Sequence, residues 1–120
     1  MGYEQLCNQI FDIDKQIRYV GIFSKSAEII AGGMRQGVKT LTPEPITQVS
    51  IQQSLLRWQT RTQMEEWIGA PKYAVAEYEK IKRFTFYLDK EKILLVSTEL
   101  GIKTDFLIDE ILKILPDYNS

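Results

Sequence analysis

The sequence contains no histidine and only one cysteine among its 120 residues. Histidine is the commonest general base near neutral pH and the commonest metal ligand. Its absence therefore excludes Ser-His and Cys-His nucleophilic pairs and most zinc and iron sites. Catalysis by carboxylates or lysines stays open as an alternative, but it demands strongly shifted pKa values at neutral pH. We predict a protein that is not an enzyme and that holds no cofactor and no metal.

The sequence also lacks long apolar runs and a strong net charge. No apolar stretch approaches the roughly 20 residues of a membrane-spanning helix, and Glu4 stands where a signal peptide would be basic and then apolar. A formal net charge of −1 is not the basic footprint of a nucleic-acid binder. The single Cys7 cannot form an intramolecular disulfide. We expect a cytoplasmic protein that binds neither nucleic acid nor membrane.

In the first part of the chain, the spacing of apolar residues changes once, from that of a helix to that of strands. Apolar residues at helical spacing predict a helix over residues 3–13, with Cys7 buried on its apolar stripe. Two β-branched and aromatic runs, residues 17–23 and 27–33, are joined by a short polar connection and predict an antiparallel hairpin. Glycines in these strands indicate a bulge or a close approach of two backbones.

A long helix is predicted over residues 47–68. In the irregular segment 34–46, Pro43 and Pro45 are expected to delay the start of this helix, and Gly69-Ala70-Pro71 to end it. The apolar side chains of the helix cover more than one core-facing face requires: Ile51, Leu55, Leu56, Trp58, Met64, Trp67 and Ile68. We therefore expect the helix to cover a sheet and to offer its other edge to a partner.

Three strands and one helix complete the pattern. The strands are expected over residues 73–78, 81–88 and 92–98. The second of them alternates as in a sheet with one buried face, and the third is apolar on both faces, which suits a central strand. The last helix is expected to open with Thr104 as its N-cap and to end before Pro116.

These elements predict one domain over residues 1–120, of class α+β. With 44% hydrophobic and 26% charged residues, the composition is that of a globular protein. The hairpin connections predict a five-stranded, mainly antiparallel sheet, and the element order is α-β-β-α-β-β-β-α.

This element order resembles Roadblock/LC7 domains, which are similar to profilin folds and share a sheet order with PAS sensor domains. The Roadblock resemblance implies the strand order two, one, five, four, three. It also implies that the third strand is an edge able to pair with a second copy, with the long helix packed beside it. The run from Ala76 to Thr85, together with Leu94-Leu95-Val96-Ser97, also resembles small archaeal proteins of unknown function.

Two groups of residues are candidates for binding a partner. Arg57, Trp58 and Arg61 combine an aromatic plane with two cations at helical spacing, as partner hot spots do. With them we assign Met64 of the helix and Tyr73 and Val75 of the edge strand to the partner site. The alternative for Trp58 is an ordinary core position, and we expect Trp67 in the core.

The densest cluster of charged residues lies around residues 77–83. Its cations Lys80, Lys82 and Arg83 are candidates for contact with an anion or a partner at the sheet edge. The alternative is a solvated face with cross-strand ion pairs, each worth only a few tenths of a kcal/mol.

We predict a non-enzymatic interaction or signalling module that forms a homodimer through the long helix and the edge strand and binds a further protein partner. The alternative is a PAS-like sensor that binds a small molecule between the sheet and segment 34–46. One long helix stands where PAS domains have several short ones. Histidine or cysteine for a haem or flavin adduct is also lacking there, which argues against a redox or light cofactor.

Overall fold

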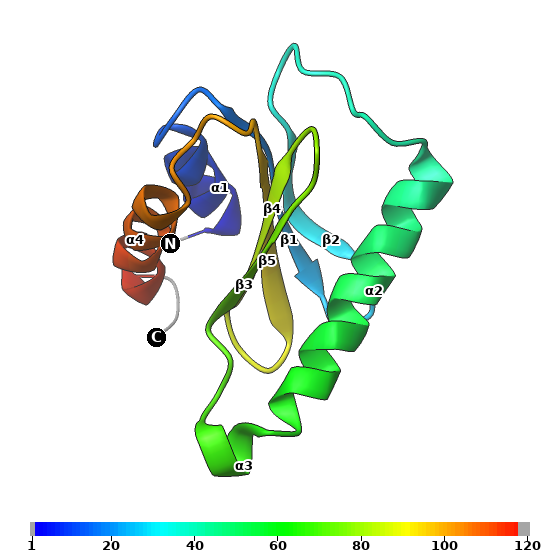
Figure 1. Ribbon diagram of the computed structural model, residues 1–120, viewed down its shortest axis with the longest axis vertical. Coiled ribbons are helices and arrows are strands. Elements are labelled where there is room, and N and C mark those ends of the chain that lie inside the picture. Colours follow the sequence, from blue (N-terminus) through cyan, green and yellow to red (C-terminus); the bar gives the residue numbers. More distant parts are fainter. Residues whose placement is uncertain (1, 118–120) are drawn as a thin grey trace.

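A five-stranded antiparallel sheet forms the middle layer of the computed structural model, which describes residues 2–117 (Figure 1). The strands follow one another across the sheet in the order β2-β1-β5-β4-β3. Their bounds are β1 Ile17–Ser24, β2 Ile29–Met34, β3 Tyr73–Glu77, β4 Lys82–Tyr87 and β5 Lys92–Thr98. The predicted α+β class, the strand order and the central place of the doubly apolar strand are confirmed.

Helices cover both faces of the sheet (Figure 1). Helices α1 and α4 lie on one face, and α2 crosses the other face, with the short α3 at its end. Their bounds are α1 Tyr3–Phe11, α2 Glu44–Thr62, α3 Glu65–Ile68 and α4 Thr104–Ile114, followed by the 3-10 turn η1 Leu115–Asp117. Of the helices in residues 2–117, none is long and apolar enough to span a membrane.

The larger core lies between the sheet and the α1/α4 layer. Its fully buried side chains come from three strands and from both helices: Leu6, Ile10, Ile17, Val20, Ile22, Phe84, Phe86, Leu94, Val96, Leu107 and Ile111. Cys7 belongs to the same core and is 1% exposed, as predicted. Burial in this apolar layer raises the pKa of the Cys7 thiol from 9.0 to about 11, and the nearby Glu4 carboxylate adds to the shift.

The second core lies between the sheet and α2. It joins Phe23, Ile93 and Leu95 of the sheet to Ile51, Leu55 and Trp58 of the helix. Gly21 is required here, because a Cβ at this position would lie 2.6 Å from the Tyr19 hydroxyl oxygen and 2.9 Å from the Phe23 ring. The expected close approach of two backbones is found at Gly32, where a Cβ would clash with the Val20 carbonyl group, whereas at Gly21 neighbouring rings fill the space over the backbone.

The predicted long helix differs at both ends. It begins at Glu44 and not at residue 47, because Pro45 occupies its first turn, where the missing N–H has no helical partner to lose. The expectation that Pro45 delays the helix is wrong. The helix also ends at Thr62, and α3 follows as a separate turn before Gly69, whose φ of 88° reverses the chain.

Smaller differences concern other ends of elements. Strand β2 begins at Ile29, because Ala27 adopts a φ of 66° in the turn and cannot continue a ladder. Helix α1 ends at Phe11. Lys103 holds the N-cap position of α4, so Thr104 is its first residue and the predicted cap is one position off.

Candidate functional site

Strand β3 forms one edge of the sheet. It pairs with β4 from Tyr73 opposite Phe86 to Glu77 opposite Lys82 without a bulge, and no strand of the described chain lies beyond it. It contains no proline and carries only one charged side chain, that of Glu77. Such an edge leaves a row of peptide groups available for a strand of another chain.

The side chains of β3 alternate between the two faces of the sheet. Tyr73 and Val75 pair with the buried phenylalanines of β4 and lie on the α1/α4 face, where they stay 43% and 39% exposed. Ala74 and Ala76 lie on the α2 face. Tyr73 and Val75, the partner-site residues predicted in the edge strand, therefore lie on the face opposite to α2, which carries the partner-site residues predicted in the helix. The two groups of residues meet only along the edge of the sheet.

Helix α2 contacts β4, the strand next to this edge. The Ser50 hydroxyl accepts a hydrogen bond from Arg83, and Arg61 Nη1 donates to the Tyr87 hydroxyl at 2.7 Å. Trp58 stacks on Tyr87 with ring centroids 6.2 Å apart. With an exposed fraction of 5%, Trp58 is a core residue, as in the alternative considered for it, whereas Arg61 is exposed.

The side of α2 that points away from the sheet is apolar and uncharged. We call Ile46, Val49, Gln53 and Leu56 the outer face of α2. Its three apolar members are 54%, 47% and 62% exposed. The sequence carries no charged residue from position 45 to position 56, and the exposed Arg57 follows. A solvent-facing helix surface normally carries charges, so this one has the character of a contact surface.

Three more apolar side chains are exposed, two in helix α3 and one at Met64, the residue that precedes it. Met64 is 50% exposed, and Trp67 and Ile68 are each 75% exposed. The expected core position of Trp67 is wrong, because the chain leaves the axis of α2 after Thr62 and α3 projects beyond the end of the sheet (Figure 1). Together with the outer face of α2, these side chains extend the exposed apolar surface.

The three cations predicted at the sheet edge do not lie together. Lys80 is exposed in the turn before β4. Lys82 is 8% exposed on the α1/α4 face, where its Nζ donates to the Ile102 carbonyl oxygen at 2.7 Å and to Thr104 Oγ1 at 3.0 Å. The expected surface position of Lys82 is wrong. Arg83 lies on the opposite, α2 face, because successive strand residues point to opposite faces.

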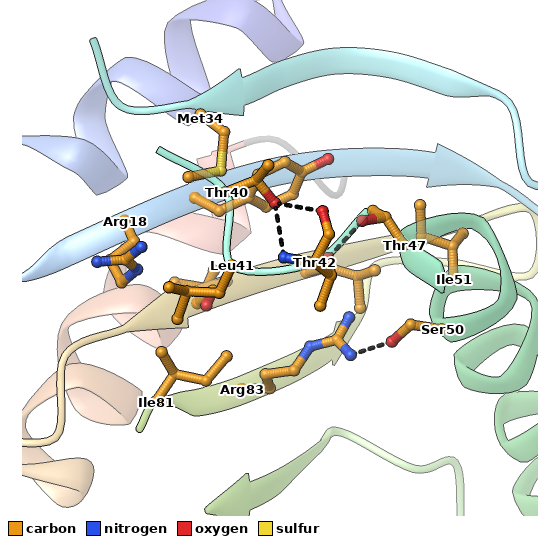
Figure 2. A pocket seen from close by; sticks show the side chains of 14 residues that line it. Arg18, Met34, Thr40, Leu41, Thr42, Thr47, Ser50, Ile51, Ile81 and Arg83 are labelled. Atoms are coloured by element: carbon orange, nitrogen blue, oxygen red, sulfur yellow. Dashed lines mark hydrogen bonds between the residues drawn. The ribbon is translucent and has the colours of Figure 1, made fainter. Parts of the chain in front are cut away.

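A cavity of about 130 Å³ lies between the sheet, the N-terminal half of α2 and residues 40–42 (Figure 2). This is the place where the sensor alternative puts a ligand. Sequence analysis identified Arg83 as a candidate anion contact and segment 34–46, which supplies Met34 and residues 40–42, but not the other residues that line this cavity. The polar lining consists of two guanidinium groups and six hydroxyl groups, from Arg18, Arg83, Tyr19, Thr40, Thr42, Thr47, Ser50 and Ser97.

Arg18 of β1 binds the connection between β2 and α2, which forms one wall of this cavity, to the sheet. Its Nη2 donates to the Lys39 carbonyl oxygen at 2.8 Å, and its Nη1 forms a 2.8 Å ion pair with Glu99. Arg35 holds the start of the same segment through the carbonyl oxygens of Ile17 and Phe11, at 2.6 and 2.7 Å. The connection between β2 and α2 is thus anchored at defined points.

Tyr19 forms part of the cavity floor as a neutral phenol. Burial raises the pKa of its hydroxyl group from 10.0 to about 12, and the neighbouring Arg83 guanidinium opposes this shift. The Tyr19 hydroxyl therefore keeps its proton at neutral pH and can donate as well as accept a hydrogen bond.

The described residues contain no group of three or more histidine, cysteine, aspartate and glutamate side chains that could hold a metal ion. The Asp14 carboxylate accepts a hydrogen bond from the Gln16 N–H at 2.8 Å.

No protein-family model and no curated protein matches this sequence. Solved structures do match its fold. MglB from Myxococcus xanthus superposes with a TM-score of 0.74 at 12% identity, covering 97% of this chain and 90% of that protein. A Roadblock/LC7 domain from Streptomyces avermitilis gives a TM-score of 0.70 at 9% identity, covering 95% and 92%.

A profilin from Schizosaccharomyces pombe is also similar, with a TM-score of 0.64 at 14% identity and coverage of 98% and 95%. The resemblance to small archaeal proteins stays a prediction. Identities this low establish the fold alone, and the chain has the fold of Roadblock/LC7 domains and profilins.

Proposed function

We propose that this protein is a non-enzymatic interaction and signalling module that acts as a homodimer. In the proposed dimer, the β3 strands of two copies pair along their free edges. The outer face of α2 and the side chains of Arg57, Arg61, Met64, Tyr73 and Val75 then contact the second copy or a further protein partner. Trp58 stabilises this surface, because it is buried between α2 and Tyr87 and holds the helix on the sheet.

The observation that carries this proposal is the position of the uncharged helix beside an open strand. Helix α2 is bonded to β4 through Ser50 and Arg61, so the next strand beside it is the free β3. On that side β3 presents only Ala74 and Ala76. Small side chains there leave room for a helix of a second copy to approach, and the outer face of α2 supplies the apolar area.

One solved structure of this fold is described as MglB with tetrameric arrangement, and it superposes on this chain with a TM-score of 0.67 at 7% identity. Self-association in a protein of the same fold supports the proposal. The net charge of −1 favours a protein partner over nucleic acid. We also propose a cytoplasmic location, which suits a buried thiol at Cys7.

Light scattering coupled to size exclusion at micromolar concentration tests the dimer. We expect a mass twice the 13.9 kDa of one chain. Leu56→Glu puts a charge on the outer face of α2 and should give a monomer with unchanged circular dichroism. Leu100→Glu is the matched control, because Leu100 is also exposed, at 39%, and lies after β5, away from the proposed interface. A monomeric wild-type mass would refute the homodimer.

A second candidate function is a sensor that binds a small molecule, and the cavity under residues 40–42 favours it. A ligand that binds only the folded state raises the free energy of unfolding by mass action. A screen of small metabolites should therefore find a compound that raises Tm in proportion to the logarithm of its concentration. If no compound in such a screen changes Tm, the sensor function fails and the dimer proposal is unaffected.

A further inference from the structure

The floor of the cavity is one row of side chains that crosses four strands. Met34, Tyr19, Ser97 and Arg83 pair in sequence from β2 through β1 and β5 to β4. All four side chains line the cavity. Figure 2 shows Arg83 reaching under Thr42 toward Ser50, with which it shares a hydrogen bond.

The two arginines of the cavity differ in how their charge is compensated. The charge of Arg18 is compensated, because Arg18 pairs with the Glu99 carboxylate, and it also donates to the Lys39 carbonyl oxygen. Arg83 forms no ion pair with any acidic side chain of the described chain, and its one hydrogen bond goes to the neutral Ser50 hydroxyl. A guanidinium group carries five N–H donors in a fork that matches a carboxylate, so Arg83 has donors left for an anion.

Glu44 forms no ion pair with Arg83. It stands exposed in the first turn of α2 and is not among the cavity residues, although its negative charge adds to the larger effect of burial in raising the pKa of Tyr19. Its carboxylate lies 3.4 Å from Gln48 Nε2, from which it accepts a hydrogen bond. The hydroxyl groups of Ser97 and Tyr19, which stand in the same row of side chains as Arg83, can donate to the remaining lone pairs of a bound anion.

The rest of the cavity is apolar and small. Leu41, Ile51, Ile81 and Leu95 line it together with the stem of Met34. Its volume of about 130 Å³ is close to the ~150 Å³ of an engineered cavity that accepts one benzene ring. A ligand of roughly six to nine non-hydrogen atoms fits this space.

We infer that this cavity binds a small organic monoanion, with a carboxylate held by Arg83 and a short branched or cyclic hydrocarbon body against Leu41 and Ile51. This inference rests on the second of the two proposed functions and names its class of ligand. One uncompensated guanidinium matches one negative charge. An inorganic phosphate dianion would bring a second charge and would leave the apolar walls unfilled.

Titration of the ¹⁵N-labelled protein with sodium isovalerate, followed by NMR, tests the inference. We expect saturable shifts at residues 40–42, 50 and 97, with a Kd of about 10 μM to 1 mM for so small a ligand. Isovaleramide has the same shape without the charge and should bind at least tenfold more weakly, because it cannot form the charge-assisted pair. Phosphate should bind more weakly than isovalerate.

Two variants locate the binding site. Arg83→Met should abolish isovalerate binding, whereas Lys113→Met, which removes the same charge from the exposed end of α4, should leave the Kd unchanged. Leu41→Trp should fill the cavity and block binding while Arg83 is intact. This variant therefore still tests the site if Arg83→Met perturbs the fold. Circular dichroism checks each variant.

The outcomes separate the inference from the function on which it rests. If isovaleramide binds the same residues as tightly as isovalerate, the sensor function stands and the monoanion inference is overturned. Tighter binding of phosphate, or unchanged binding by a folded Arg83→Met variant, overturns it as well. If neither isovalerate, its amide nor phosphate gives saturable shifts up to ~20 mM, a concentration that would reveal even a millimolar Kd, the inference fails. The thermal-shift screen then decides the sensor function separately.

Discussion

Trp58 of α2 stacks on Tyr87 of β4, with ring centroids 6.2 Å apart and ring planes at 18°. Arg61 donates to the hydroxyl of the same tyrosine. At the other end of the helix, Arg83 of β4 donates to Ser50. Helix α2 is therefore attached to one strand at two points. The cavity and the outer face of α2 lie on opposite sides of the helix.

Trp58→Ala should destabilise the protein by about 3 to 5 kcal/mol, because it leaves a large hole under α2. Trp67→Ala, at a position that is 75% exposed, should change the free energy of unfolding by less than about 0.5 kcal/mol. Urea unfolding followed by circular dichroism measures both values. If Trp67→Ala is as destabilising as Trp58→Ala, the exposed position of α3 is wrong.

The fold could be predicted because its signals are local in the chain. Period-two alternation in β4 and the doubly apolar β5 indicate a half-buried and a central strand, and both were found. The break between α2 and α3 could not be predicted, since residues 47–68 carry apolar side chains throughout and no glycine or proline marks Thr62. Pro45 was misread because a proline before a helix and a proline in its first turn look alike in sequence.

The site was predicted less well than the fold. Strand alternation alone separates Lys82 from Arg83, so treating them as one cluster neglected a rule that the sequence already supplied. The cavity, in contrast, could not be predicted from any local rule. It is assembled by four strands, the start of α2 and residues 40–42, and the pairing of Arg18 with Glu99 decides which arginine is free. Such long-range pairings have no signal in a single sequence.

Lys82→Met should destabilise the protein by about 1.5 to 3 kcal/mol, because the Ile102 carbonyl group loses a charged donor at a buried site. The loss of the Thr104 bond should also loosen the start of α4. Lys80→Met is the matched control at an exposed turn and should fall within about 0.5 kcal/mol of wild type. Chemical denaturation measures the difference, and equal stability of the two variants would contradict the anchoring role of Lys82.

Arg35→Gln should destabilise the protein by about 2 to 3 kcal/mol. The guanidinium group of Arg35 donates to the carbonyl oxygens of Ile17, Phe11 and Asp14 and lies 5.0 Å from the Phe11 ring centroid, so it joins α1, β1 and β2. A glutamine side chain cannot serve all of these acceptors. Lys113→Gln, at an exposed position of α4 with a surface ion pair to Glu110, should leave the free energy of unfolding nearly unchanged, and a neutral Arg35→Gln in thermal unfolding would refute this role.

Stability should fall as pH rises from about 9 to about 11 through Cys7. Burial raises the pKa of this thiol from 9.0 to about 11 in the folded state. Within that window the unfolded chain has lost the thiol proton while the folded chain keeps it. Since the unfolded state then binds fewer protons, the free energy of unfolding decreases with pH. Tyr19 acts in the same sense between about 10 and about 12, because burial raises its pKa as well.

Cys7→Ala removes the titration of the thiol. Burial, the largest cause of the raised pKa of Tyr19, stays in this variant, whereas the part of the shift that the Cys7 charge causes is lost. The free energy of unfolding of the variant should be lower than that of wild type at pH 7, where the side-chain packing is lost. It should decline less steeply than wild type between pH 9 and 11, the interval set by the pKa shift of the thiol. Urea unfolding at intervals across this range provides the slopes. Equal slopes would show that the thiol titrates alike in the folded and the unfolded chain.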